Sequence, residues 1–162
     1  MCGVMVVGLL ALLGLMAFPV TTTQEAEPVI AASQSACAVT LPNGMTPPAE
    51  EPAPGHHGNG QLYTVLALDG EIRADERFIE ADGTNGWKLP IWRALGVGEP
   101  GDLEISGHEL MTGTAIRSLI PKGYGQRFQA SGVYFPGAGC YEVTLRSSDA
   151  SLTFITRVSA HS

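Results

Sequence analysis

Basic residues are scarce in this 162-residue chain and absent from its first 72 positions. Nine lysines and arginines stand against sixteen acidic residues, which gives a formal net charge of −7 at pH 7. A protein that binds nucleic acid needs a basic stripe to neutralise phosphates, and the nine basic residues here are scattered along the sequence. We therefore expect no nucleic-acid partner.

Motifs for nucleophilic catalysis are also missing. The sequence contains no Gly-x-Ser-x-Gly and no Ser-x-x-Lys. The pair His108-Glu109 resembles the start of a zinc-protease motif, but position 112 is threonine where the second histidine would stand, and the stretch is strand-like. We therefore expect no enzymatic activity. A hydrolase without a recognisable motif ranks third, behind the two hypotheses given below.

An almost unbroken apolar run extends from Val4 to Phe18 and ends at Pro19. It is shorter than the ~20 residues of a membrane-spanning helix and is typical of a signal peptide. We assign residues 1–32 to a signal peptide or membrane anchor, with a buried core helix as the alternative. The usual basic residues of a leader are missing, so either the start lies upstream of Met1 or export tolerates a neutral leader. We expect an extracytoplasmic protein that contacts a membrane only through this segment.

Cysteine occurs only at positions 2, 37 and 140. Loss of Cys2 with the leader would leave an even pair in an oxidising compartment, so we predict a Cys37–Cys140 disulfide. This bond would close the loop between positions 37 and 140, and for a loop of roughly 100 residues the chain-entropy model gives a stabilisation of about 4.7 kcal/mol. Two alternatives stay open. Cys37 could carry a lipid, although the apolar run ends well before it at Phe18, and two free buried thiols would require a reducing compartment.

Residues 33–60 have the composition of a linker, rich in proline and glycine and poor in periodic hydrophobicity. One weakly alternating patch, residues 37–41, precedes the turn signal Pro42-Asn43-Gly44. If the predicted disulfide forms, this segment becomes a strap across the following domain instead of a free tail.

Strand patterns separated by glycine-containing turns recur from residue 61 onward. The expected strands are 62–68, 71–74, 87–95, 102–106, 108–111, 115–120 and 126–135, followed by a closing hairpin within 136–158. No helix is convincing, so residues 61–162 are predicted to form an all-β, immunoglobulin-like antiparallel β-sandwich, with a small barrel as the alternative. In the hairpin Tyr141, Val143 and Leu145 alternate with polar residues, so Cys140 should face outward.

Short motifs are spread along the same region. They are Tyr124-Gly125, Phe128-Gln129-Ala130-Ser131-Gly132, Phe135-Pro136, Gly139-Cys140-Tyr141-Glu142-Val143-Thr144 and Ser151-Leu152-Thr153-Phe154, together with Cys37, Pro42-Asn43-Gly44 and His57-Gly58-Asn59-Gly60. This set resembles a pattern in uncharacterised exported or lipid-anchored bacterial proteins of Gram-positive type. Tyr141 departs from that pattern, in which the aromatic residue is often tryptophan. The resemblance implies an exported sandwich and no particular activity.

Histidines supply the candidates for a metal site. His56 and His57 lie in a predicted loop, and with Met45, His108 or His161 they could hold copper or zinc. Adjacent histidines in a flexible segment point in different directions and are usually solvated. A small metal-binding envelope protein is therefore our second hypothesis, and we predict no resident cofactor.

Aromatic side chains supply the candidate for ligand contact. Trp87 shares its predicted face with Leu89 and Ile91, which indicates the core, whereas Trp92 lies on the opposite face. An outward tryptophan often marks an interface. Our leading hypothesis is an exported binding, adhesion or structural module whose partner is a cell-envelope protein or polysaccharide, with Trp92 as a contact.

Overall fold

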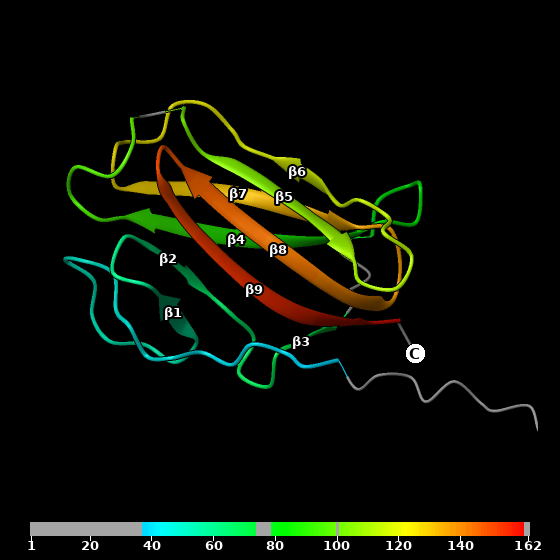
Figure 1. Ribbon diagram of the computed structural model, residues 1–162. Coiled ribbons are helices and arrows are strands. Elements are labelled where there is room, and N and C mark those ends of the chain that lie inside the picture. The colour runs from blue at the N-terminus through cyan, green and yellow to red at the C-terminus, as the bar shows by residue number, and fades with distance from the viewer. Residues whose placement is uncertain (1–36, 74–78, 100, 161–162) are drawn as a thin grey trace, which may run out of the picture. The chain divides into compact units, whose positions relative to one another are not determined.

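The computed structural model describes residues 37–73, 79–99 and 101–160 of the chain. These residues form nine strands in two sheets that pack face to face (Figure 1). The predicted leader, residues 1–32, lies outside the described residues. In the described part, no helix is long and apolar enough to cross a membrane.

The nine strands are distributed over the two sheets. They are β1 (His56–Gly58), β2 (Leu62–Val65), β3 (Glu71–Arg73), β4 (Asn85–Arg93), β5 (Glu104–Glu109), β6 (Arg117–Leu119), β7 (Phe128–Phe135), β8 (Gly139–Ser147) and β9 (Ala150–Ser159). The five-stranded sheet has the order β1-β2-β4-β7-β6, and the four-stranded sheet has the order β3-β9-β8-β5. Neighbouring strands are antiparallel except β3 and β9, which run parallel.

This strand order is that of an immunoglobulin-like sandwich, as predicted. Strands β2, β4, β7 and β6 take the places of A, B, E and D, and β5, β8 and β9 take those of C, F and G. Tyr141 adds a second hallmark. It lies near the start of β8, and its hydroxyl donates a hydrogen bond of 3.0 Å to the carbonyl of Gly137, which is the geometry of a tyrosine corner.

The core lies between the two sheets and is made by alternate residues of the long strands. Leu89 and Ile91 of β4 and Val143 and Leu145 of β8 are at most 1% exposed. Full burial of such a side chain contributes about 1.5–3 kcal/mol. The predicted alternation of the closing hairpin is confirmed, because Cys140 lies on the face opposite these residues and is only partly buried.

Two sequence expectations about local structure are wrong. Gly107 was expected to form a turn, yet it lies within β5, where a Cβ atom would collide with the carbonyl oxygen of Glu142. Residues His56–Gly58, expected in a linker, form the buried strand β1. A three-residue strand that contains two histidines has no apolar alternation to reveal it. The described residues from Cys37 onward belong to one compact unit, so the described part of the expected linker belongs to the domain.

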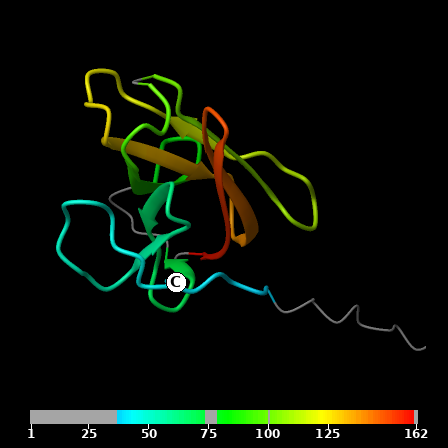
Figure 2. The same cartoon turned by 60° about the vertical axis from the view of Figure 1, so that its left-hand side comes forward.

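A disulfide joins Cys37 to Cys140 of β8, as predicted, with their Cα atoms 5.7 Å apart. From Cys37 the chain runs beside β9 and then to β1 (Figures 1 and 2), and we call residues 37–48 the strap. The amide of Thr40 donates to the carbonyl of Ile155 at 2.8 Å, and the Thr40 hydroxyl accepts from the amide of Ile155 at 2.9 Å. A sulfur in a disulfide cannot carry a lipid, so the lipid alternative for Cys37 is wrong.

Asn43 attaches the strap to the edge of the five-stranded sheet. Its Nδ2 donates to the carbonyl of Gly58 at 2.7 Å, and its Oδ1 accepts from the amides of Gly58 and Met45, both at 3.1 Å. The amide of Gly44 donates to the carbonyl of His56 at 2.9 Å. Unpaired backbone groups on an edge strand invite pairing with other chains. The strap therefore bonds to the edge strand β1 and to Ile155 of β9, which lies outside the pairing of β9 with β3.

We predict that Asn43→Ala lowers the free energy of unfolding by about 2 kcal/mol, because three hydrogen bonds of about 1 kcal/mol or less each are lost. Asn43→Asp keeps the acceptor but sets a second carboxylate oxygen against the carbonyl of Gly58, so it should lose at least as much. Urea unfolding of the three proteins measures both values. An Asn43→Ala variant as stable as the wild type would contradict the structural role of this side chain.

Candidate functional site

The outer face of the five-stranded sheet carries a row of aromatic rings. Tyr63, Trp92 and Phe128 are direct cross-strand partners on β2, β4 and β7, so their side chains share this face. The ring centroids of Trp92 and Phe128 are 5.3 Å apart. Tyr124, from the loop between β6 and β7, packs edge-on against Phe128 at 5.8 Å. We call Trp92, Phe128 and Tyr124 the aromatic row.

Trp92 lies on the predicted face but is partly buried. Its indole N–H donates to a carboxylate oxygen of Glu50 at 3.1 Å, and the ring of His56 meets it edge-on at 6.0 Å. The more accessible rings are those of Phe128 and Tyr124, which are 37% and 39% exposed. Trp92 thus forms the fixed end of the row, and the two other rings form its accessible part.

The sequence did not reveal Phe128 as a site residue, because β7 places polar side chains at some inward positions and an aromatic side chain outside. Gln129 and Ser131 point inward and are buried, while Phe128 points outward. The two buried polar side chains are satisfied by backbone carbonyls: Gln129 donates to Pro121 at 2.8 Å, and Ser131 donates to Leu89. A strand with polar residues at its inward positions and a large aromatic outside is the signal that could have pointed to this face.

Arg93 holds the loops at this end of the sheet. Its side chain is 1% exposed, and its guanidinium donates to the carbonyls of Glu99 at 2.8 Å and Gly125 at 3.3 Å. Its backbone amide donates to the carbonyl of Arg127 at 2.9 Å. Burying a charge is costly, and these hydrogen bonds offset part of that cost, although the buried Nε of Arg93 has no hydrogen-bond partner among the described residues. The guanidinium therefore ties the loop that carries Tyr124 to the end of β4.

The predicted histidine pair is split between two environments. Successive residues of a strand point to opposite faces, so His56 meets the ring of Trp92 while His57 points away from it. Both side chains are buried, in contrast to the solvated loop expected from the sequence. Met45 is exposed on the strap, and His161 lies outside the described residues. Within the described ranges, no group of three or more His, Cys, Asp or Glu residues is placed to hold a metal ion.

The pair that resembles a zinc-protease motif lies in β5, as the strand-like pattern predicted. His108 is exposed, whereas Glu109 is buried on the other face. The carboxylate of Glu109 accepts hydrogen bonds from the amides of Thr112 at 2.6 Å and Met111 at 2.9 Å. These bonds, that of Thr112 above all, hold the pKa of Glu109 below its usual range. Glu109 therefore supports the turn that follows β5.

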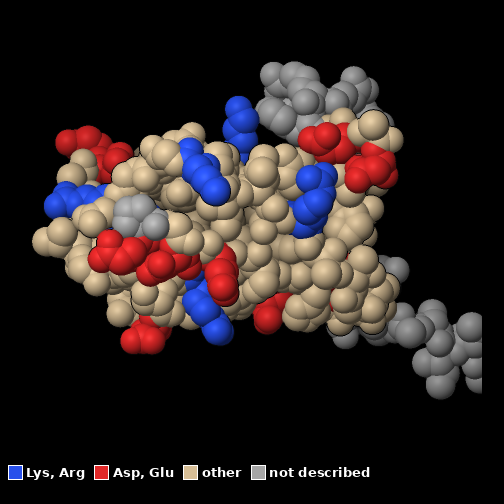
Figure 3. Space-filling model, turned by 90° about the horizontal axis from the view of Figure 1, so that it is seen from above, with Lys and Arg blue, Asp and Glu red and all other residues tan. Residues whose placement is uncertain are grey.

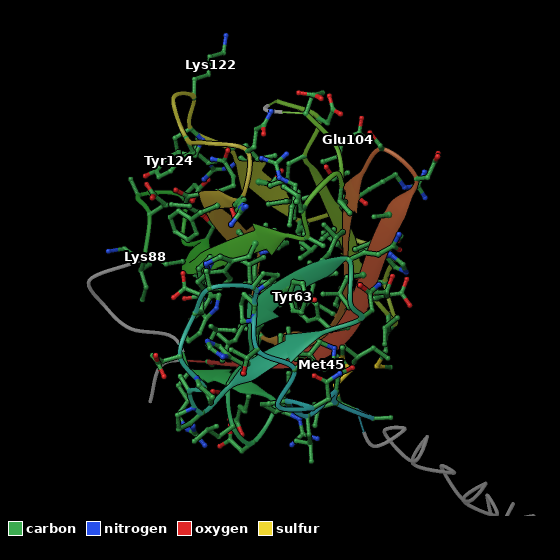
Figure 4. The ribbon with its side chains drawn as sticks, turned by 90° about the vertical axis from the view of Figure 1, so that its left-hand side faces the viewer. Met45, Tyr63, Lys88, Glu104, Lys122 and Tyr124 are labelled. Atoms are coloured by element: carbon green, nitrogen blue, oxygen red, sulfur yellow. A yellow bond between two sulfur atoms is a disulfide. The ribbon has the colours of Figure 1, made fainter. Side chains whose placement is uncertain are left out.

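The five-stranded sheet carries basic but no acidic residues. Its five strands contain no aspartate or glutamate, although the carboxylate of Glu50, outside the sheet, accepts a hydrogen bond from the Trp92 indole. Lys88 and Arg117 are exposed on β4 and β6, and Lys122 is exposed in the loop that carries Tyr124 (Figure 4). Seen from above, carboxylates lie along the lower part of the molecule and at both ends of the upper rim, while the middle of that rim is basic or uncharged (Figure 3).

Compared with protein-family models, curated proteins and solved structures, the chain matches none of them. The resemblance to exported bacterial proteins stays a prediction, and the function has to be inferred from the residues of the site.

We predict that stability falls on acidification through the titration of His57. Burial lowers the pKa of its imidazole below the usual 6.5, although the carbonyl of Leu41 opposes this shift. The unfolded state therefore takes up the proton first, and stability that is present above pH 6.5 is lost as the pH falls toward the lower pKa of the folded state. Thermal unfolding between pH 7.5 and 5.5 measures this loss.

The matched control is the exposed His108. His57→Gln should reduce the drop in melting temperature across this pH range, and His108→Gln should leave the drop unchanged. An unchanged pH dependence in His57→Gln would show that another group is responsible.

Proposed function

We propose that this protein is an exported, envelope-associated, non-catalytic module that binds a cell-envelope polysaccharide on the outer face of its five-stranded sheet. The observation that carries this proposal is the aromatic row, in which Phe128 and Tyr124 lie exposed beside the anchored Trp92. Exposed aromatic side chains on a rigid sheet are typical of interaction sites.

The size of the exposed row supports a sugar polymer over a protein partner. At 37% and 39% exposure, Phe128 and Tyr124 offer roughly 150 Å² of surface together, since an aromatic side chain has about 150–250 Å² to bury. A standard protein interface buries about 800 Å² on each partner. A patch of this size suits stacking on one or two sugar rings.

The Cys37–Cys140 bond supports an extracytoplasmic location, because disulfides persist in oxidising compartments and are rare in the cytosol. The apolar run from Val4 to Phe18 is consistent with export. A module that is exported and presents aromatic rings would meet envelope polymers directly.

The test is co-sedimentation with insoluble cell-wall polysaccharide from the producing cells. We expect the wild-type protein to sediment and the double variant Phe128→Ala/Tyr124→Ala to bind at least tenfold more weakly, which is a loss of about 1.4 kcal/mol. The matched control is Leu110→Ala/Met111→Ala, which removes two exposed apolar side chains from the turn after β5.

This control should sediment like the wild type, and thermal unfolding should confirm that all three proteins are folded. A wild-type protein that stays in the supernatant, or an aromatic variant that sediments equally well, would refute the proposed binding face.

A further inference from the structure

We propose that the polymer bound on this face is an acidic polysaccharide, extended along β4 and β7 and contacted by Lys122, Lys88 and Arg117. The inference rests on the proposed function and goes beyond it by naming the charge of the ligand, its path and the residues that would recognise it.

The charge of the five-stranded sheet is opposite to that of the whole chain. Its strands carry Lys88, Arg93 and Arg117 and no carboxylate, in a protein with a net charge of −7. Arg93 is buried, so the outward charge comes from Lys88 and Arg117. The Debye length is about 8 Å at physiological ionic strength, and two packed sheets lie about 10 Å apart. A ligand on this face would therefore sense its cations more strongly than the carboxylates of the opposite sheet. One carboxylate, that of Glu50, lies on this face at Trp92.

The spacing of the cations points to a polymer. Arg117 is paired with Tyr134 of β7, and Lys88 is paired with Gly132. Tyr134 is six residues from Phe128, which corresponds to about 20 Å along the strand. Lys122 lies beyond Phe128, in the loop that carries Tyr124. Charges spread over this length do not converge on one small anion, but they can each meet a different unit of a linear polyanion.

The surface between these cations is smooth. The outward residues of β7 between Phe128 and Tyr134 are Ala130 and Gly132. The ring of Tyr134 lies over Gly132, where a Cβ atom would be 3.4 Å from it. Small residues in the middle and aromatic rings at both ends leave a flat track for an extended chain of sugar rings.

Three basic side chains at or beside this face, Arg117, Lys122 and Arg127, are exposed. Arg117, Lys122 and Arg127 form no ion pair with any carboxylate among the described residues. Asp82 lies within Coulombic reach of Arg117 but does not pair with it. The guanidinium of Arg117 lies over the ring of Tyr134 at 4.0 Å. Such stacking orients the group while its N–H donors can still bind a carboxylate.

The test compares two polymers that differ only in charge, polygalacturonate and its methyl ester. Calorimetry at low salt should give at least tenfold tighter binding of polygalacturonate, and raising the salt concentration should weaken its binding and leave that of the ester unchanged. Arg117→Gln/Lys122→Gln should reduce the preference for polygalacturonate by about tenfold without changing the affinity for the ester.

The matched control is Arg146→Gln/Arg157→Gln, which removes the same charge from exposed positions on β8 and β9. This variant should keep the wild-type preference. Two results would refute the proposal that the ligand is acidic and leave the proposed function intact. They are equal affinity of the wild type for the two polymers, and an equal loss of the preference for polygalacturonate in both double variants. The acidic polysaccharide would also be refuted as the ligand if the protein bound single-stranded DNA as tightly as polygalacturonate. The same holds if the protein bound neither polymer but still bound the cell wall. Loss of wall binding is the separate failure of the proposed function.

Discussion

The Cys37–Cys140 disulfide is the constraint on which the arrangement of the proposed binding face depends. It fixes the start of the strap to β8, and the strap then bonds to Ile155 of β9 and, through Asn43, to Gly58 of β1. Strand β1 is only three residues long, so its position relies on partners on both sides. His56 of this strand and Glu50, which follows the strap, are the groups that hold Trp92. By restricting the unfolded chain, the disulfide stabilises the strap, and the strap in turn holds the residues that fix Trp92.

The rest of the site depends on strand register and on one buried cation. Pairing of β4 with β7 sets Trp92 opposite Phe128, and a shift by one residue would turn Phe128 into the core. Arg93 then holds the loop of Tyr124 through the carbonyl of Gly125. Rigid strands and a tethered loop present the rings at little entropic cost, which is the condition for useful affinity from a small contact area.

The sequence predicted the sandwich and the outward face of Trp92, because alternation along β4 and β8 is a local property, and it predicted the disulfide from the number of cysteines left after loss of Cys2. It did not reveal β1, since buried histidines interrupt apolar alternation and their burial depends on the distant strap. Phe128 was hidden for a related reason: Gln129 is tolerated inside only because the carbonyl of Pro121 accepts its hydrogen bond. Strand register and the hydrogen bonding of buried polar side chains depend on the tertiary structure, and they decide which residues make the site.

The most direct test of the strap's role is amide hydrogen exchange on the native protein before and after reduction of the disulfide. If the disulfide positions the strap, reduction should remove the protection of the amides of Thr40, Gly44 and Gly58, each of which makes a hydrogen bond between the strap and a strand. The amides shared by β4 and β7 should stay protected, because their pairing does not involve the strap. Undiminished protection of Thr40, Gly44 and Gly58 after complete reduction would contradict the dependence of the strap and β1 on this disulfide.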